Sequence, residues 1–142
     1  MYKSILVPLD LSEPSSWQRA LPVAAELSRA FGAQIHVTTV VRDFDAIWKS
    51  QYSLSTYESL ISEAEGRLAS IVEESIPKGL TIKRTVKHGI IYAEILRTAR
   101  ESGADLIVMA SHRPEMKDYL IGANAARVVR HASCSVLVVR ES

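Results

Sequence analysis

Three short runs of apolar residues lack the polar-apolar alternation of a half-buried strand. They cover residues 5–7, 106–109 and 136–139 and are rich in valine and isoleucine. Continuous apolar runs of this length are typical of strands that are covered on both faces, as in a parallel sheet. Residues 35–41 and 81–86 alternate more, and they predict strands nearer an edge of the sheet.

Helical periodicity fills the segments between these runs. Apolar residues recur at intervals of three or four from Trp17 to Phe31, and Gly32 follows as a C-terminal stop. Ser12 is placed to cap this helix, with Pro14 in its first turn. Pro22 then falls in the interior and predicts a bend. Three further helices are predicted over residues 60–72, 91–99 and 121–132.

The resulting order is β-α-β-α-β-α-β-α-β over 142 residues, a length that suits one domain. Strands that alternate with helices predict parallel strands joined by right-handed crossovers, with helices on both faces. The expected fold is therefore a single α/β domain, residues 1–142. Its sheet is doubly wound, parallel and five-stranded, in the flavodoxin-like strand order 3-2-1-4-5.

Composition excludes several classes of protein. Lysine and arginine total 17 against 16 acidic residues and form no dense block, which argues against a nucleic-acid or anionic-membrane surface. No apolar run approaches the roughly 20 residues of a membrane span. The N-terminus shows no signal-peptide cleavage pattern, and the one cysteine, Cys134, can form no disulfide within the chain. We expect a cytoplasmic protein.

A ligand site is expected beyond the carboxyl ends of the strands that end at Val7 and Met109. In open parallel sheets, ligands bind where the strand order reverses. Asp10 follows the first of these strands, and its carboxylate can accept hydrogen bonds from ribose hydroxyls or an adenine amino group. Asp10 or Ser12 can equally cap the following helix, and the two roles are compatible.

The segment after the fourth strand offers a second set of candidates. Gly122 stands just before the last helix, whose N-terminal N–H groups and dipole favour phosphate. The alternative is that Gly122 is only a turn residue and Arg113 a solvated charge. Neither a Walker lysine motif nor G-x-G-x-x-G occurs. Among the histidines only His112 lies near the crevice, and no spacing predicts a metal site.

Four segments together resemble the universal stress protein family across essentially the whole chain. They are residues 1–10, 103–111, 122–132 and 135–140. The resemblance implies an adenine nucleotide α-hydrolase-like fold. The family's nucleotide-binding members share a loop in which two residues separate the first two glycines and nine precede a final Gly-Ser/Thr.

This chain departs from that loop. Ala110 and Arg113 replace the first two glycines, eight residues separate Arg113 from Gly122, and Ala123 takes the Ser/Thr position. The shortened loop is similar to that of the family's F/G-type subgroup, whose members carry nucleotide despite the change. Arg113 or Lys117 can supply positive charge in place of glycine amides.

The resemblance implies an adenine-nucleotide pocket, with Asp10 on the ribose or base, Val41 against adenine through its backbone, and amides of residues 122–124 on phosphate. The implied ligand is ATP, or AMP or ADP, with or without magnesium. The implied pocket residues are Pro8, Leu9, Asp10, Val41, Met109, Ala110, Ser111, His112, Arg113, Gly122, Ala123, Asn124, Ser135 and Val136.

Two functional classes follow. The first is a stress-response regulator that binds adenine nucleotide and acts through a homodimer, formed by the last strand from Val136 to Val139, and an unidentified regulatory partner. The second is a dimeric stress scaffold of the same fold that binds no nucleotide. No catalytic residue is assigned, since the sequence offers no evident general base, and at most slow ATP hydrolysis or autophosphorylation is expected. The long segment of residues 42–57 is a candidate lid.

Overall fold

Five parallel strands form one sheet in the order β3-β2-β1-β4-β5, which confirms the predicted fold class and strand order. The computed structural model describes residues 1–42, 54–111 and 123–140. The strands are β1 (Ser4–Leu9), β2 (Gln34–Arg42), β3 (Ile82–Gly89), β4 (Leu106–Ala110) and β5 (Ser135–Val139).

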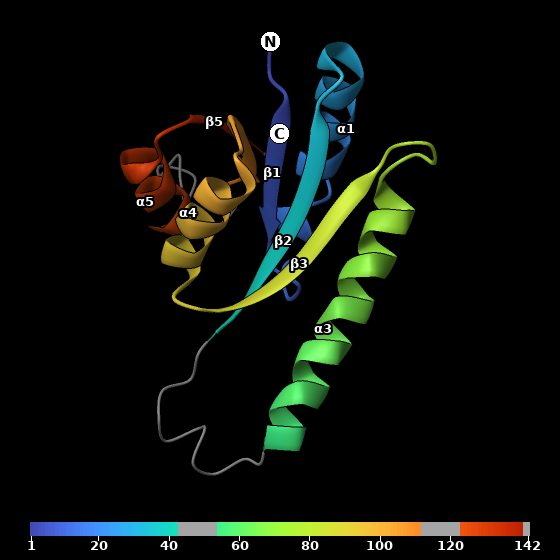
Figure 1. Ribbon diagram of the computed structural model, residues 1–142, viewed down its shortest axis with the longest axis vertical. Coiled ribbons are helices and arrows are strands. Elements are labelled where there is room, and N and C mark those ends of the chain that lie inside the picture. Colours follow the sequence, from blue (N-terminus) through green and yellow to red (C-terminus); the bar gives the residue numbers. More distant parts are fainter. Residues whose placement is uncertain (43–53, 112–122, 141–142) are drawn as a thin grey trace.

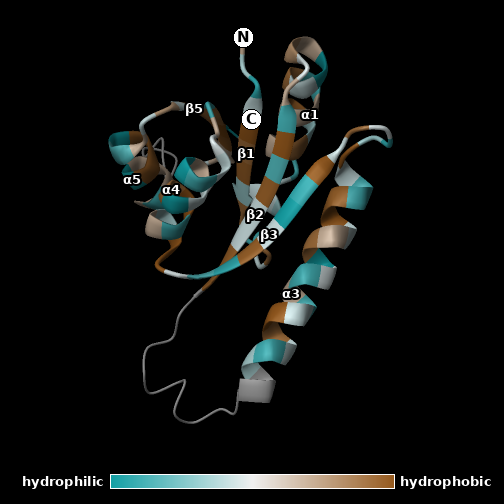
Figure 2. Cartoon of the chain, in the orientation of Figure 1, coloured by the Kyte–Doolittle hydropathy of each residue, from teal (hydrophilic) through white to brown (hydrophobic). Residues whose placement is uncertain are grey.

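Helices cover both faces of the sheet, with α1 and α3 packed on one face and α4 and α5 on the other (Figure 1). Hydrophobic and hydrophilic bands alternate along α3, as expected for a helix with one face on the sheet (Figure 2). The chain forms one short 3-10 helix, η1 (Pro14–Ser16). The α-helices are α1 (Ala20–Phe31), α3 (Leu54–Ser75), α4 (Ile91–Ser102) and α5 (Ala123–His131).

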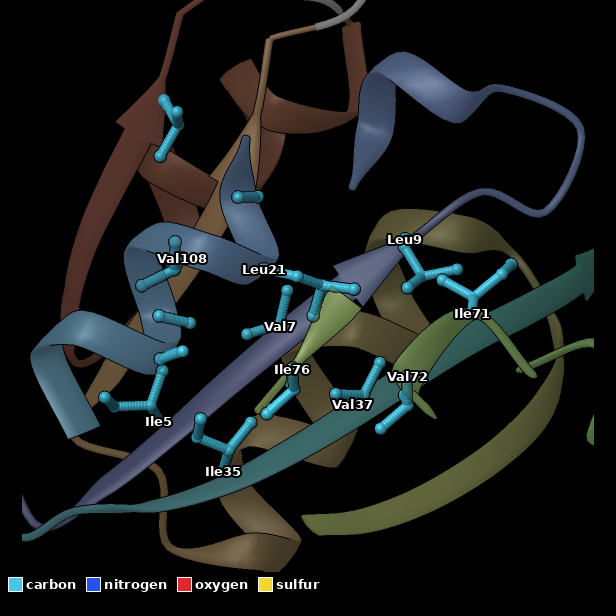
Figure 3. Close-up of a cluster of buried hydrophobic side chains, with 14 of the residues drawn as sticks. Ile5, Val7, Leu9, Leu21, Ile35, Val37, Ile71, Val72, Ile76 and Val108 are labelled. Atoms are coloured by element: carbon cyan, nitrogen blue, oxygen red, sulfur yellow. The ribbon is translucent and has the colours of Figure 1, made fainter. Parts of the chain in front are cut away.

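The central strand β1 is buried on both faces. Ile5 and Val7 point into the core beneath α1 and α3 (Figure 3), whereas Leu6 points into the core beneath α4 and α5. All three side chains are fully buried. The uninterrupted apolar run of residues 5–7 therefore reflects a strand with a hydrophobic layer on each side.

The strand order is as predicted, but two expectations drawn from apolar patterning alone are wrong. Residues 136–139 predicted a strand covered on both faces, but β5 is an edge strand and Leu137 is 39% exposed. Residues 35–41 predicted a strand near an edge, yet residues 35–39 of β2 are all buried. The strand β3 is an edge strand, as predicted. Composition alone does not distinguish an apolar edge from an apolar centre.

The expected bend at Pro22 is absent because the chain forms two helices in place of one. After η1 the chain turns, and α1 begins only at Ala20. Pro22 is then the third residue of α1, where its missing N–H breaks no intrahelical hydrogen bond. Ser12 does not cap either helix; Glu13 precedes η1, without a capping side-chain bond.

The C-terminal end of α1 is as predicted. Gly32 adopts the left-handed conformation, with φ of 69°, and donates its N–H to the carbonyl of Ser28. Phe31, which was expected on the core face, is 39% exposed and packs edge-on against Tyr2 with ring centroids 5.7 Å apart.

Within the described ranges, no helix combines the length and apolar character that crossing a bilayer requires.

Two buried threonines on opposite faces of the sheet differ in hydrogen bonding. Thr39 Oγ1 donates to the carbonyl of Leu9 at 2.9 Å. Thr98 Oγ1, on the buried face of α4, has no hydrogen-bond partner among the described residues. Each threonine is 2% exposed. Comparing the same substitution at the two sites therefore shows how much a hydrogen bond to a buried hydroxyl contributes to stability.

We predict that Thr98→Val raises the free energy of unfolding by about 1 kcal/mol, since it removes a buried, unsatisfied hydroxyl. Thr39→Val, the matched control, should lower it by about 1 kcal/mol because it breaks a buried hydrogen bond. Urea unfolding measures both. Equal destabilisation by the two variants would contradict the assignment of Thr98 as unsatisfied.

Candidate functional site

The hydrogen-bonded ladder between β1 and β4 ends before either strand does. Their ladder consists of the pairs Ile5–Leu106 and Leu6–Ile107, whereas β1 remains paired with β2 as far as Leu9–Thr39. Pro8, which has no N–H to donate, lies in β1 beyond the last ladder pair with β4. The strand order reverses between β1 and β4, and open parallel sheets bind ligands beyond the carboxyl ends of the strands at such a point.

The loop after β1 is held by its own side chains. Asp10 N–H donates to Ser16 Oγ at 2.8 Å, and Ser16 Oγ donates back to the Asp10 carbonyl at 3.0 Å. Asp10 Oδ1 accepts from the Ser12 N–H at 2.9 Å and from the Ser12 hydroxyl at 2.7 Å. This turn is typical of aspartate after a strand. Asp10 thus stabilises a turn through Ser12. This local role is similar to the helix-capping role that the sequence predicted as the alternative to ligand binding.

Neighbouring elements fix both ends of this loop. The Leu9 carbonyl accepts the Thr39 hydroxyl of β2, and the Leu11 carbonyl accepts Arg67 Nη2 of α3 at 2.8 Å. The carboxylate of Asp10 is therefore carried on a braced backbone. Among the described residues, its Oδ2 accepts no hydrogen bond and remains available to a ligand.

Ser16 is a positioning residue that sequence reasoning missed. It is 2% exposed, and its hydroxyl makes two of the hydrogen bonds that shape the loop. The neighbouring Ser15 is chemically identical, so no pattern in the sequence marks Ser16. Only the turn between η1 and β1 shows which of the two hydroxyls points inward.

The predicted residues at the end of β4 contribute mainly backbone. Met109 and Ala110 are each 4% exposed, and their side chains belong to the cores on opposite faces. Ser111 is half-buried, and its N–H donates to the Val139 carbonyl at 3.1 Å. Because the Ala110 methyl group lies in the core, replacing a family glycine here adds no exposed bulk.

The end of β2 lies beside the end of β1, at the same edge of the sheet. Val41 lies two residues beyond Thr39, the partner of the last residue of β1, and is half-buried. It pairs with His88 of β3, so its strand remains regular at that point. Val41 is therefore at the carboxyl edge of the sheet, near the end of β1.

The start of α5 belongs to the same edge. Only three residues separate the end of α5 from β5, whose first residue is at the amino edge of the sheet, so α5 begins towards the carboxyl edge. Ala123 is exposed and Asn124 half-buried at its N-terminus. His112, Arg113, Lys117 and Gly122 lie outside the described residues.

Ser135 and Val136 do not lie at this edge of the sheet, contrary to expectation. Ser135 pairs with Leu106, the first residue of β4, and its hydroxyl accepts from Tyr2 at 3.1 Å. Both residues are therefore towards the amino edge, roughly 10–13 Å of strand from the end of β4. Their assignment to the pocket was implied by the family resemblance alone.

The carboxylate of Asp105 fastens the opposite end of the same two strands. It accepts the backbone N–H groups of Lys3 and Ser4 at 2.9–3.2 Å. These hydrogen bonds, chiefly the one from Lys3, lower the pKa of Asp105 below its usual value.

In the described part of the chain, no group of three histidine, cysteine or acidic side chains could hold a metal ion.

Comparison with known proteins identifies relatives along the whole chain. Universal stress protein G of Shigella flexneri is 34% identical, covering 99% of this chain and all of that protein. Universal stress protein G of Salmonella typhimurium is 32% identical, with the same coverage.

Solved structures share the fold. That of the hypothetical protein MJ0577, named in Methanocaldococcus jannaschii as a universal stress protein, has a TM-score of 0.80 and 25% identity over 100% of this chain and 98% of that one. A universal stress protein in complex with cAMP has a TM-score of 0.64 and 24% identity, over 99% and 98% of the two chains.

The Archaeoglobus fulgidus protein in complex with dAMP has a TM-score of 0.67 and 21% identity, over 96% and 97% of the two chains. At the sequence level, residues 1–140 match the universal stress protein family as a whole. The chain therefore belongs to the universal stress protein family.

Proposed function

We propose that this protein binds an adenine nucleotide in the crevice between β1 and β4 and acts as a nucleotide-dependent regulator in the stress response. The observation that carries the proposal is the reversal of strand order between β1 and β4, where the ladder ends before Pro8 and the braced Asp10 follows β1 at the edge from which α5 starts. Two family neighbours described as complexes with cAMP and dAMP support an adenine nucleotide as the ligand.

The adenosine would lie across the ends of β1 and β2. Backbone groups of Leu9 and Val41 would face the base, and Asp10 Oδ2 would accept a ribose hydroxyl. Since Oδ1 is already bonded to Ser12, the carboxylate is oriented before ligand arrives. Pre-orientation of this kind reduces the entropy lost on binding.

The phosphates would lie at the start of α5. The first turn of a helix leaves N–H groups unpaired and carries about half a positive charge, so residues 122–124 suit an anion. Arg113 or Lys117 would add charge where the family has glycine amides. For ATP, magnesium would be held by phosphate oxygens and water.

The homodimer that we propose uses β5, and the two edges of the sheet favour this choice. The edge strand β3 carries Lys83, Arg84 and Lys87, and charged edges resist pairing with another chain. The edge strand β5 carries no charge and leaves Leu137 exposed. The regulatory partner is unidentified, and the lone Cys134 supports a cytoplasmic location.

Calorimetry tests the nucleotide site directly. We expect ATP or AMP to bind, and Asp10→Ala to weaken binding about tenfold because a charged hydrogen bond to ribose is lost. Gly122→Val should also weaken binding, by crowding the phosphate amides. Glu63→Ala, an exposed site on α3, is the matched control and should leave affinity unchanged.

Far-ultraviolet dichroism must be unchanged in all these variants for the comparison to hold. Absence of heat with ATP, AMP and GTP at millimolar concentration would favour the second class of function, a dimeric scaffold without nucleotide.

Light scattering tests the dimer. We predict that Val138→Glu yields monomers, since a buried carboxylate at a strand-pairing edge is unfavourable. Arg84→Glu places the same charge on the β3 edge and should leave the dimer mass unchanged. Dimers in both variants would contradict a β5 interface.

A further inference from the structure

A chain of hydrogen bonds joins three side chains on the face of the sheet that α4 covers. His36 Nε2 is 2.8 Å from Thr85 Oγ1, and Thr85 Oγ1 donates to Thr38 Oγ1 at 3.1 Å. Thr38 Oγ1 donates in turn to the Thr85 carbonyl at 3.2 Å. His36 is 7% exposed and Thr38 fully buried. We call these three residues the His36 relay.

The hydrogen-bond directions favour one tautomer of His36. The single hydroxyl proton of Thr38 goes to a carbonyl, which can only accept, so Thr38 Oγ1 must accept from Thr85. The Thr85 proton is thereby committed, and Thr85 Oγ1 must accept from His36. The proton of the neutral imidazole therefore resides on Nε2, and Nδ1 carries a bare lone pair.

The Nδ1 atom is buried and has no hydrogen-bond partner in the described part of the chain. Thr98 Oγ1 of α4 is also buried and unpartnered, yet no hydrogen bond joins it to Nδ1. Protonation would therefore add a charged N–H at a position with no acceptor. Such a group costs much more to bury than the neutral acceptor that it replaces.

Burial and the nearby lysines oppose protonation of His36. Burial and then the positive charges of Lys83 and Lys87, on β3, lower the pKa of His36 below its ordinary value of 6.5. On α4, Glu101 lies 3.8 Å from Lys87 and so partly offsets that charge. The other α4 pair, Glu94 and Arg97 at 3.6 Å, joins two residues of the same helix.

We propose that His36 is an acid-responsive element of this fold: protonation at Nδ1 places a charged N–H without an acceptor beneath α4 and loosens α4 from β2 and β3. The unfolded chain binds this proton more readily than the folded one, so stability falls with falling pH. The contribution is complete above pH 6.5 and is lost progressively below it. The inference concerns the fold and holds whether or not nucleotide binds.

Urea unfolding at pH 7.5 and 5.5 tests the proposal, because most carboxylates stay ionised in this interval. His36→Gln is the key variant: its amide nitrogen can donate to Thr85 Oγ1 as Nε2 does, but it does not titrate. His131→Gln, at the exposed end of α5, is the matched control. We expect the wild type and His131→Gln to lose a larger part of their urea midpoint at pH 5.5 than His36→Gln does. An equal loss in all three would overturn the proposal.

A second measurement uses the wild type alone and does not depend on the variant folding. Nitrogen-detected NMR of the imidazole rings should show His36 with its proton on Nε2 at pH 7.5. Hydrogen exchange of β2, β3 and α4 should accelerate at pH 5.5 more than that of α1, after correction for intrinsic rates. A proton on Nδ1, or uniform acceleration across the sheet, would contradict the His36 relay as the sensor.

Discussion

The strand order of the sheet reverses between β1 and β4, and the candidate site depends on this reversal. The ladder between β1 and β4 ends after two residue pairs, whereas β1 stays paired with β2 to its last residue. Pro8 lies beyond the last pair with β4 and cannot donate a hydrogen bond to either neighbour. The polar loop after β1 and the start of α5 lie at the same edge of the sheet. A site of this kind follows from strand geometry before any side chain is considered.

Much of the fold could be predicted because a strand that is buried on both faces consists of an uninterrupted run of apolar residues. β1 and β4 lie in the interior of the sheet, so their apolar runs are unbroken and short enough to exclude a helix. The apolar run of β5 led to the wrong prediction that this strand is covered on both faces. A run that includes an exposed residue such as Leu137 is compatible with a buried strand and with an edge strand that pairs with a partner. Periodicity also could not place Pro22, because a proline in a first turn and one in a helix interior have the same apolar neighbours.

The candidate site was predicted less completely. The position of Asp10 follows from its place after an apolar strand, but the role of Ser16 depends on how the chain turns back. Ser135 and Val136 were grouped with the site through the family resemblance, whereas β5 begins at the far edge of the sheet. At Ala110 the departure from the family's glycine pattern is less of an obstacle to ligand binding than the sequence suggests, because the methyl group of Ala110 is in the core.

The central claim, that adenine nucleotide occupies the crevice beside Pro8, is tested most directly by NMR titration of the nitrogen-15-labelled protein with ATP. The account predicts that the largest shifts fall on the amides of Asp10, Val41, Ser111 and Asn124, at the carboxyl ends of the strands. Shifts centred on Ser135 and Val136 at the amino edge, or none at millimolar ATP, would contradict it.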